Sequence, residues 1–205
     1  MKRTRLAHYL VVAVVLVATR VHAQDINRFS EEISLFYLHP TKEHYDILQQ
    51  RADKYAGVLQ KKGNRADLLT AAWIARVSQK YHLEITGRSE IAAKAREIAG
   101  GQSQIAKYVR DDNSIDPGKL DIWWVDFYAT GDTEYLGKIL RHAEKLHAGQ
   151  KAAEMLVPFA ASWSFKSNCK QHPAVLAYAK SCLKTNKFPQ KKEFLQECVN
   201  YSEKR

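Results

Sequence analysis

The sequence predicts an all-α protein built as an array of antiparallel helical hairpins. Only five prolines and nine glycines occur in 205 residues, which is few for the many turns of a β-sandwich or barrel. Apolar residues recur at steps of three and four in successive segments that are joined by short connections, and this spacing is typical of amphipathic helices. With 45% hydrophobic and 26% charged residues, the composition is that of one folded domain.

The first 23 residues predict a secretory signal peptide. The basic residues Lys2, Arg3 and Arg5 precede an apolar run, Leu10–Ala18, and small residues end at Ala23. This run of about nine residues is shorter than the roughly 20 needed to span a bilayer. We therefore expect cleavage after Ala23, a single all-helical domain over 24–205 without a transmembrane segment, and a periplasmic or secreted location.

The net charge of +10 is unevenly distributed. Residues 1–23 contain four basic side chains and no acid, so +6 remains without them. Residues 24–165 are balanced, with 19 basic and 19 acidic side chains, whereas residues 166–205 contain nine basic and three acidic ones. The lysine-rich C-terminal end is expected to be a solvated face, with an anionic-surface binder as the alternative. Because lysine predominates over arginine there, we do not expect nucleic-acid recognition.

Helices are expected in eight segments. Their ranges are Thr41–Lys61, Ala66 to near Gly87, Ser89–Ala99, Leu120–Ala129, Thr133–Leu146, Ala152–Ser167, Ala174–Leu183 and Gln190–Ser202. Thr41 is a good N-cap and Gly63 a good stop for the first helix. The apolar stripe of that helix consists of Tyr45, Leu48, Ala52, Tyr55 and Leu59.

Two short segments that are 44 residues apart are similar in sequence, which favours repeated hairpins. The segment Thr86–Glu90 parallels Thr130–Glu134 in residue type. In each copy the Thr-Gly pair is expected to end one helix, and the hydroxyl of Ser89 or Thr133 to cap the next.

The stretch from Leu120 to Ala143 resembles the tetratricopeptide pattern. Phe127 falls on the first-helix aromatic of that family, and Ala143 falls on its second-helix alanine. Glu134, Gln150 and Met155 replace the expected tyrosine, alanine and proline, so the resemblance is to a degenerate member. Leu120–Asp132, with Asn168–Pro173, also resembles segments of uncharacterised exported bacterial proteins, which implies no activity. The tetratricopeptide resemblance implies stacked helix pairs with a concave binding surface.

Catalytic and cofactor signatures are absent from the sequence. It contains no G-x-S-x-G, H-E-x-x-H, G-x-G-x-x-G or P-loop pattern. We therefore expect no catalytic residues, no cofactor and no metal.

Asp121, Trp123, Asp126 and Tyr128 are the candidate binding residues. On one helix, Leu120, Trp124 and Phe127 share a core face, so Trp123 and Tyr128 are expected to lie partly off it, beside acids. An exposed aromatic there suits a peptide or a sugar. The alternative is that these aromatics pack between neighbouring hairpins.

These observations favour an exported scaffold or binding module for a protein, a peptide or a cell-envelope component. The enzymatic alternative is a cell-wall-directed hydrolase that uses carboxylates such as Asp121, Asp126 or Glu154 in a cleft lined by Trp123 and Trp163. It requires two carboxyl groups that face one cavity.

Three cysteines, Cys169, Cys182 and Cys198, lie in the C-terminal region. The oxidising surroundings of an exported protein favour one disulfide. If the last helices are antiparallel about turns near residues 171 and 187, Cys198 is level with residue 175. Cys182 is then displaced by about seven residues, roughly 10 Å at 1.5 Å per residue, whereas a disulfide needs Cα atoms within about 7 Å. We expect Cys169–Cys198 if a pair forms, and three buried thiols otherwise.

Overall fold

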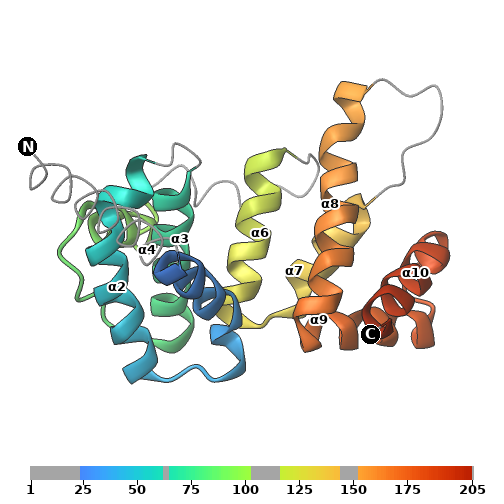
Figure 1. The fold of residues 1–205 in the computed structure, drawn as a ribbon, viewed down its shortest axis with the longest axis horizontal. Helices are drawn as coiled ribbons and strands as arrows, with labels where there is room; N and C mark the ends of the chain where they lie inside the picture. Colours follow the sequence, from blue (N-terminus) through green and yellow to red (C-terminus); the bar gives the residue numbers. More distant parts are fainter. Residues whose placement is uncertain (1–23, 62–64, 103–115, 144–151, 205) are drawn as a thin grey trace, which may run out of the picture.

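Figure 1 shows the fold in a computed structural model, which describes residues 24–61, 65–102, 116–143 and 152–204. All regular structure in these ranges is helical, which confirms the all-α prediction. A helix over 24–35 is followed by η1 (Phe36–Leu38), α2 (Lys42–Lys61), α3 (Ala66–Tyr81), α4 (Glu90–Ala99), α6 (Pro117–Thr130), α7 (Thr133–His142), α8 (Ala152–Gln171), α9 (Pro173–Thr185), η2 (Pro189–Lys191) and α10 (Lys192–Glu203).

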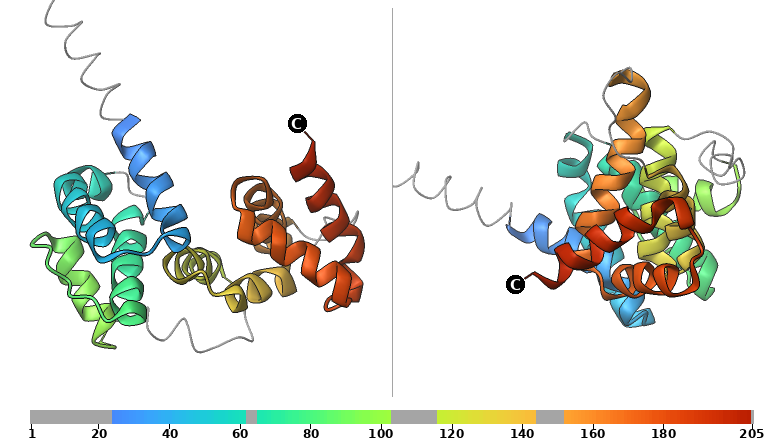
Figure 2. Two further views of the ribbon diagram at one scale, coloured as in Figure 1. Left: turned by 90° about the horizontal axis from the view of Figure 1, so that it is seen from below. Right: turned by 90° about the vertical axis from the view of Figure 1, so that its right-hand side faces the viewer.

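The helices follow one another from one end of the molecule to the other. Helix 24–35 and α2 to α4 form one end, α6 lies in the middle, and α7 to α10 form the other end (Figures 1 and 2). Many helices contact their neighbours in the sequence, including α3 with α4, α6 with α7, and α9 with both α8 and α10. The core is divided into two hydrophobic clusters, one at each end.

The central helix α6 belongs to both clusters. Its apolar residues are divided between them: Ile122, Val125 and Ala129 in the N-terminal cluster, and Leu120, Trp123, Trp124 and Phe127 in the C-terminal one. At about 100° per residue, these two sets lie on opposite sides of the helix. A helix that is apolar all round must be enclosed, and α6 is enclosed between the two ends of the molecule.

Helix 24–35 lies outside the helices predicted from the sequence. It packs on α2 through Phe29, whose ring lies 5.6 Å from that of Tyr55. Arg51 of α2 forms an ion pair with Glu32 and also donates to the backbone carbonyl of Asp25 at 3.3 Å. The helix therefore forms part of the N-terminal cluster.

The predicted start and apolar stripe of α2 are confirmed. The backbone N–H of His44 donates to Oγ1 of Thr41 at 3.1 Å, so Thr41 caps α2. All five stripe residues are buried, none more than 5% exposed. The predicted stop at Gly63 lies outside the described residues.

The two similar segments, Thr86–Glu90 and Thr130–Glu134, do not form equivalent turns. Gly131 does end α6, in the left-handed conformation with φ 69°. In the first copy, however, α3 ends at Tyr81, well before Gly87. Ser89 caps α4 as predicted, but α7 is capped by Asp132, which accepts from the Glu134 N–H at 2.9 Å, and not by Thr133.

Two polar side chains of α2 explain this difference. The Gln49 amide donates to the Glu84 carbonyl at 3.3 Å and accepts from the Thr86 N–H at 3.0 Å. Asp53 accepts from the Arg88 N–H at 2.7 Å. These bonds hold residues 84–88 against α2 outside any helix, so α3 cannot continue to Gly87.

Other helix ends differ from the prediction by at most four residues. α6 begins at Pro117, where Asp116 accepts from the Lys119 N–H at 2.9 Å and so caps the helix. α8 continues to Gln171, and α7 ends at His142. Proline at the first helical position, after an Asp cap, accounts for the early start of α6.

Candidate functional site

The four binding residues predicted on α6 do not line one open cavity. Trp123 is 1% exposed and stacks on His142 with 5.6 Å between ring centroids, so the expectation that it lies partly exposed is wrong. Tyr128 is half-buried, and its hydroxyl donates to Oδ1 of Asn168 at 2.8 Å. Both rings are used in packing because α6 is enclosed on both sides.

Asp126 is fully buried. Nε of Arg76 on α3 donates to its Oδ1 at 2.6 Å, while its Oδ2 has no hydrogen-bond partner. Burial raises the pKa of this carboxyl to about 6, against the opposing effect of Arg76. The ion pair joins α3 to α6 in the interior.

Asp121 is half-buried and lies on another side of α6 from Asp126. Burial raises its pKa, and the charge of Arg65 opposes that rise. The two acids therefore lie in different surroundings, as expected from their spacing. Trp163, which the hydrolase hypothesis places in a cleft, is 67% exposed on α8, and the side chain of Glu154 lies outside the described residues.

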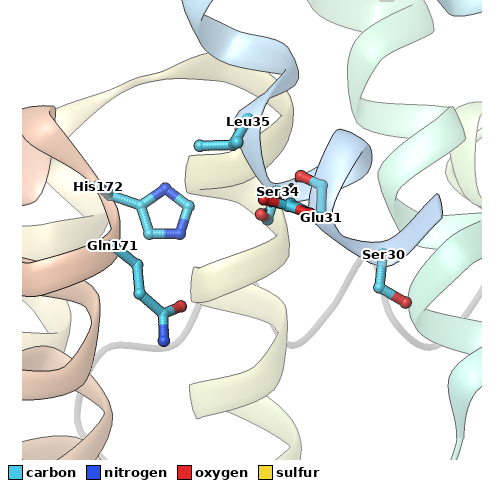
Figure 3. A pocket seen from close by; sticks show the side chains of 6 residues that line it. All are labelled: Ser30, Glu31, Ser34, Leu35, Gln171 and His172. Carbon is cyan, nitrogen blue, oxygen red and sulfur yellow. Dashed lines mark hydrogen bonds between the residues drawn. The ribbon is translucent and has the colours of Figure 1, made fainter. Parts of the chain in front are cut away.

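A pocket of about 430 Å³ lies elsewhere, between helix 24–35 and the junction of α8 with α9. Figure 3 shows its six lining side chains: Ser30, Glu31, Ser34, Leu35, Gln171 and His172. Four come from the start of the described chain and two from the turn that joins α8 to α9. The pocket thus unites segments that are about 135 residues apart in sequence.

His172 is fixed at this junction by its backbone. It precedes Pro173, the first residue of α9, and adopts the extended conformation that a residue before proline prefers. Its N–H donates to the Asn168 carbonyl at 2.8 Å, which completes the last turn of α8. The helix break at His172-Pro173 directs the imidazole toward helix 24–35 (Figure 3).

The imidazole of His172 is buried among aromatic rings. It is 2% exposed and stacks on Tyr128, with 5.2 Å between centroids. Nδ1 of His172 lies 3.4 Å from the Tyr37 hydroxyl. Burial lowers the pKa of His172 to about 4, so the ring is neutral at pH 7.

The tautomer of His172 follows from the partners of Tyr37. The Ala174 backbone N–H lowers the Tyr37 pKa, against the larger effect of burial, because it donates to the phenolic oxygen. We assign the Tyr37 hydroxyl as the donor to Nδ1, because Nδ1 is the acceptor that the described residues offer to the phenolic hydrogen, and this assignment puts the imidazole proton on Nε2. No described residue accepts a hydrogen bond from Nε2, and His172 lines the pocket.

The wall opposite His172 supplies acceptors. Ser30 and Ser34 donate their hydroxyl hydrogens to the carbonyls of Ile26 and Glu31, at 3.0 and 2.8 Å, which leaves their oxygen lone pairs free to accept. Glu31 adds a carboxylate that forms no ion pair within the described part of the chain. The pocket therefore combines one negative charge and several acceptors with an imidazole N–H donor.

Two of the three cysteine thiols are in contact with each other. Cys169 of α8 hydrogen-bonds Cys198 of α10, and this contact, together with burial, raises the pKa of the Cys169 thiol. Cys182 instead hydrogen-bonds Tyr178 of its own helix. All three thiols are buried and free. The Cys169–Cys198 disulfide stays a prediction, but the two residues it requires are in contact.

Two kinds of site are absent from the described ranges. These ranges hold no cluster of three or more His, Cys, Asp or Glu side chains able to bind a metal ion. None of their helices has the length and apolar character needed to cross a bilayer.

Comparisons with protein-family models, with curated proteins and with solved structures find no match to this chain.

Sequence patterns did not predict the pocket, because four of its six lining residues belong to helix 24–35, which was not among the predicted helices. A signal for that helix exists: Ile26, Phe29, Ile33 and Phe36 follow one another at steps of three, four and three. Its proximity to the break at His172 depends on tertiary packing, which spacing alone does not reveal.

The first prediction concerns His172 and acid stability. The unfolded imidazole has a pKa near 6.5 and the folded one about 4, so the unfolded state binds more protons between these values. Stability therefore falls as pH decreases from 6.5 to 4, by roughly 2–3 kcal/mol. Urea unfolding at pH 7 and pH 4.5 should show a smaller acid loss for His172→Gln than for wild type.

His39→Gln, at an exposed histidine, is the matched control and should retain the wild-type loss. Asp126 remains in both variants, so its opposite contribution cancels in the comparison. An acid loss in His172→Gln equal to that of wild type would contradict this assignment.

The second prediction concerns the thiols. After incubation with oxidised glutathione, peptide mapping should find a Cys169–Cys198 bridge and a free Cys182, because only the first two are in contact. Closing this loop of roughly 28 residues should stabilise the fold by about 3.5 kcal/mol. Cys182→Ser should preserve the bridge and Cys198→Ser should abolish it, whereas a bridge to Cys182 would refute the pairing.

Proposed function

We propose that this protein is an exported binding module, an array of antiparallel helical hairpins that binds a peptide segment and performs no catalysis. The observation that supports this proposal most strongly is the pocket between helix 24–35 and the α8–α9 junction. Its lining combines the Glu31 carboxylate with the Nε2–H of His172. A free peptide, a segment of a partner protein and a peptide of the cell envelope all present the groups that this lining can bind.

The charge of the pocket selects the ligand. A carboxylate without an ion-pair partner among the described residues favours an ammonium or guanidinium group, and hydrogen bonds between charged partners are the stronger ones. Ser30 and Ser34 supply further acceptors for the remaining N–H groups. We therefore propose that the bound segment is cationic, through a free amino terminus or a basic side chain.

His172 gives the second point of attachment. Its Nε2–H suits a peptide carbonyl, and its neutral state at pH 7 avoids repulsion of a cationic ligand. Stacking on Tyr128 and the hydrogen bond with Tyr37 hold the ring in place. An amine bound at Glu31 and a carbonyl bound at His172 together fix the direction of a peptide.

The third prediction tests this ligand class. In saturation-transfer NMR with mixed tetrapeptides, we expect signals from peptides with a free amino terminus or a basic residue and none from N-acetylated neutral ones. Glu31→Gln should weaken the binding of the selected peptide about tenfold or more, because a charge-assisted hydrogen bond is lost. Calorimetric titration of each variant gives the affinity.

Glu43→Gln is the matched control, since Glu43 is an exposed acid of α2 that does not line the pocket. It should bind like wild type. Equal binding of cationic and acetylated neutral peptides, or an unchanged affinity in Glu31→Gln, would refute the proposal.

A further inference from the structure

Three of the exposed large apolar side chains lie on one helix, α8. Leu156 is 66% exposed, Phe159 45% and Trp163 67%. At 100° per residue they fall within about 60° of the helix circumference. They form a continuous stripe, whereas the remaining large exposed side chains, Leu38, Ile47 and Tyr201, lie on other elements. Scattered exposed residues are ordinary, but a stripe indicates a contact surface.

The stripe is continued by two lysines. Lys166 and Lys170 lie in the same sector of α8, about 80° wide in all, on the next turns of the helix. Both ammonium groups lie 5.4 Å from the centre of the Tyr201 ring on α10, which fixes them on this side. From Met155 to Gln171 the helix contains no acid. The surface is therefore apolar over its first turns and cationic over its last ones.

The other side of α8 is already used by the core. Ala161, Phe165 and Cys169 are buried in the C-terminal cluster, and they lie opposite the stripe. α8 is thus apolar on two opposite faces, of which only one is covered by the described helices. Burial within the fold explains the first face and leaves the stripe without a structural role among the described residues.

α8, the helix that carries these residues, forms a ridge at its N-terminal end. The N-terminal turns of α8 extend beyond the neighbouring helices in Figure 1, and the end-on view of Figure 2 shows the same projection. Three such side chains expose roughly 300–400 Å², less than the about 800 Å² per partner of a stable protein–protein interface. A second copy of the chain is therefore a poor occupant.

We propose that the stripe Leu156, Phe159 and Trp163, with Lys166 and Lys170, is a contact surface for an anionic lipid bilayer. Aromatic and aliphatic side chains enter the boundary between head groups and acyl chains, to a depth of about 5–10 Å. The lysine stems extend along the apolar layer while their ammonium groups remain at the lipid phosphates. The protein then lies on the membrane without spanning it. This inference does not depend on the pocket or its ligand.

The four tryptophans make this surface directly observable. Trp73, Trp123 and Trp124 are at most 7% exposed, and only Trp163 is exposed. Residues 1–23 contain no tryptophan, so an interaction of that apolar segment with lipid does not produce the signal. Quenching of tryptophan fluorescence by lipids brominated in the acyl chain therefore reports whether Trp163 enters the bilayer.

The fourth prediction uses the full chain with vesicles of equal parts phosphatidylglycerol and brominated phosphatidylcholine. Wild type should be quenched at low salt and less so at high salt. Trp163→Phe should bind but lose the quenching, and Lys166→Glu with Lys170→Glu should weaken vesicle affinity by on the order of 10-fold or more. Vesicles without phosphatidylglycerol should give little quenching.

Two matched controls separate this surface from general charge and apolar effects. Lys80→Glu with Arg88→Glu makes the same charge change at exposed positions of the N-terminal end, and Ile47→Ser removes an exposed apolar side chain from α2. Both should bind and be quenched like wild type, and circular dichroism verifies that every variant is folded.

The proposal is overturned by any of three results. In the first, wild type binds vesicles but its fluorescence is not quenched. In the second, the charge reversal on α8 has no more effect than the control reversal. In the third, Trp163 becomes buried in a dimer without lipid, as shown by sedimentation and by protection from iodide. The first result assigns membrane binding to another segment, and the third assigns the ridge to protein association.

Discussion

The enclosure of α6 on two opposite faces is the constraint on which the rest of the structure depends. The apolar surface on both sides of α6 must be removed from water. One side, with Ile122, Val125 and Ala129, packs in the N-terminal cluster. The other side, with Leu120, Trp124 and Phe127, packs in the C-terminal cluster. The buried ion pair between Arg76 and Asp126 adds a polar contact on the same side as the first set. Since unpairing a buried charge is costly, α3 and α6 are held in one relative position.

The candidate pocket derives its geometry from this central helix. Helix 24–35 is anchored on α2, and Tyr37 of η1 extends from its end to Phe127 of α6, with 4.8 Å between ring centroids. His172 reaches the same aromatic group from the other end of the chain. The two walls of the pocket therefore share one packed support, which fixes the His172 ring before a ligand binds.

The sequence predicted well those elements that depend on local signals. The stripe of α2, the caps at Thr41 and Ser89 and the left-handed end at Gly131 each follow from a few adjacent residues, and all are present. The exposure predicted for Trp123 was wrong because α6 has no single buried face, so periodicity could not rank its sides. The Glu31–His172 pocket depends on long-range packing, and the contact of Cys169 with Cys198 was foreseen only because antiparallel neighbours restrict the possible pairs.

Whether the two ends of the molecule form one cooperative unit through α6 is tested most directly by native-state hydrogen exchange at increasing urea, read by mass spectrometry. Because α6 supplies part of both clusters, peptides from α3 and α9 should converge on the same free energy of opening and the same urea dependence. Val125→Ala, which changes only the face toward the N-terminal cluster, should lower protection in both regions. Loss of protection in α3 while α9 retains its wild-type opening free energy would contradict this account.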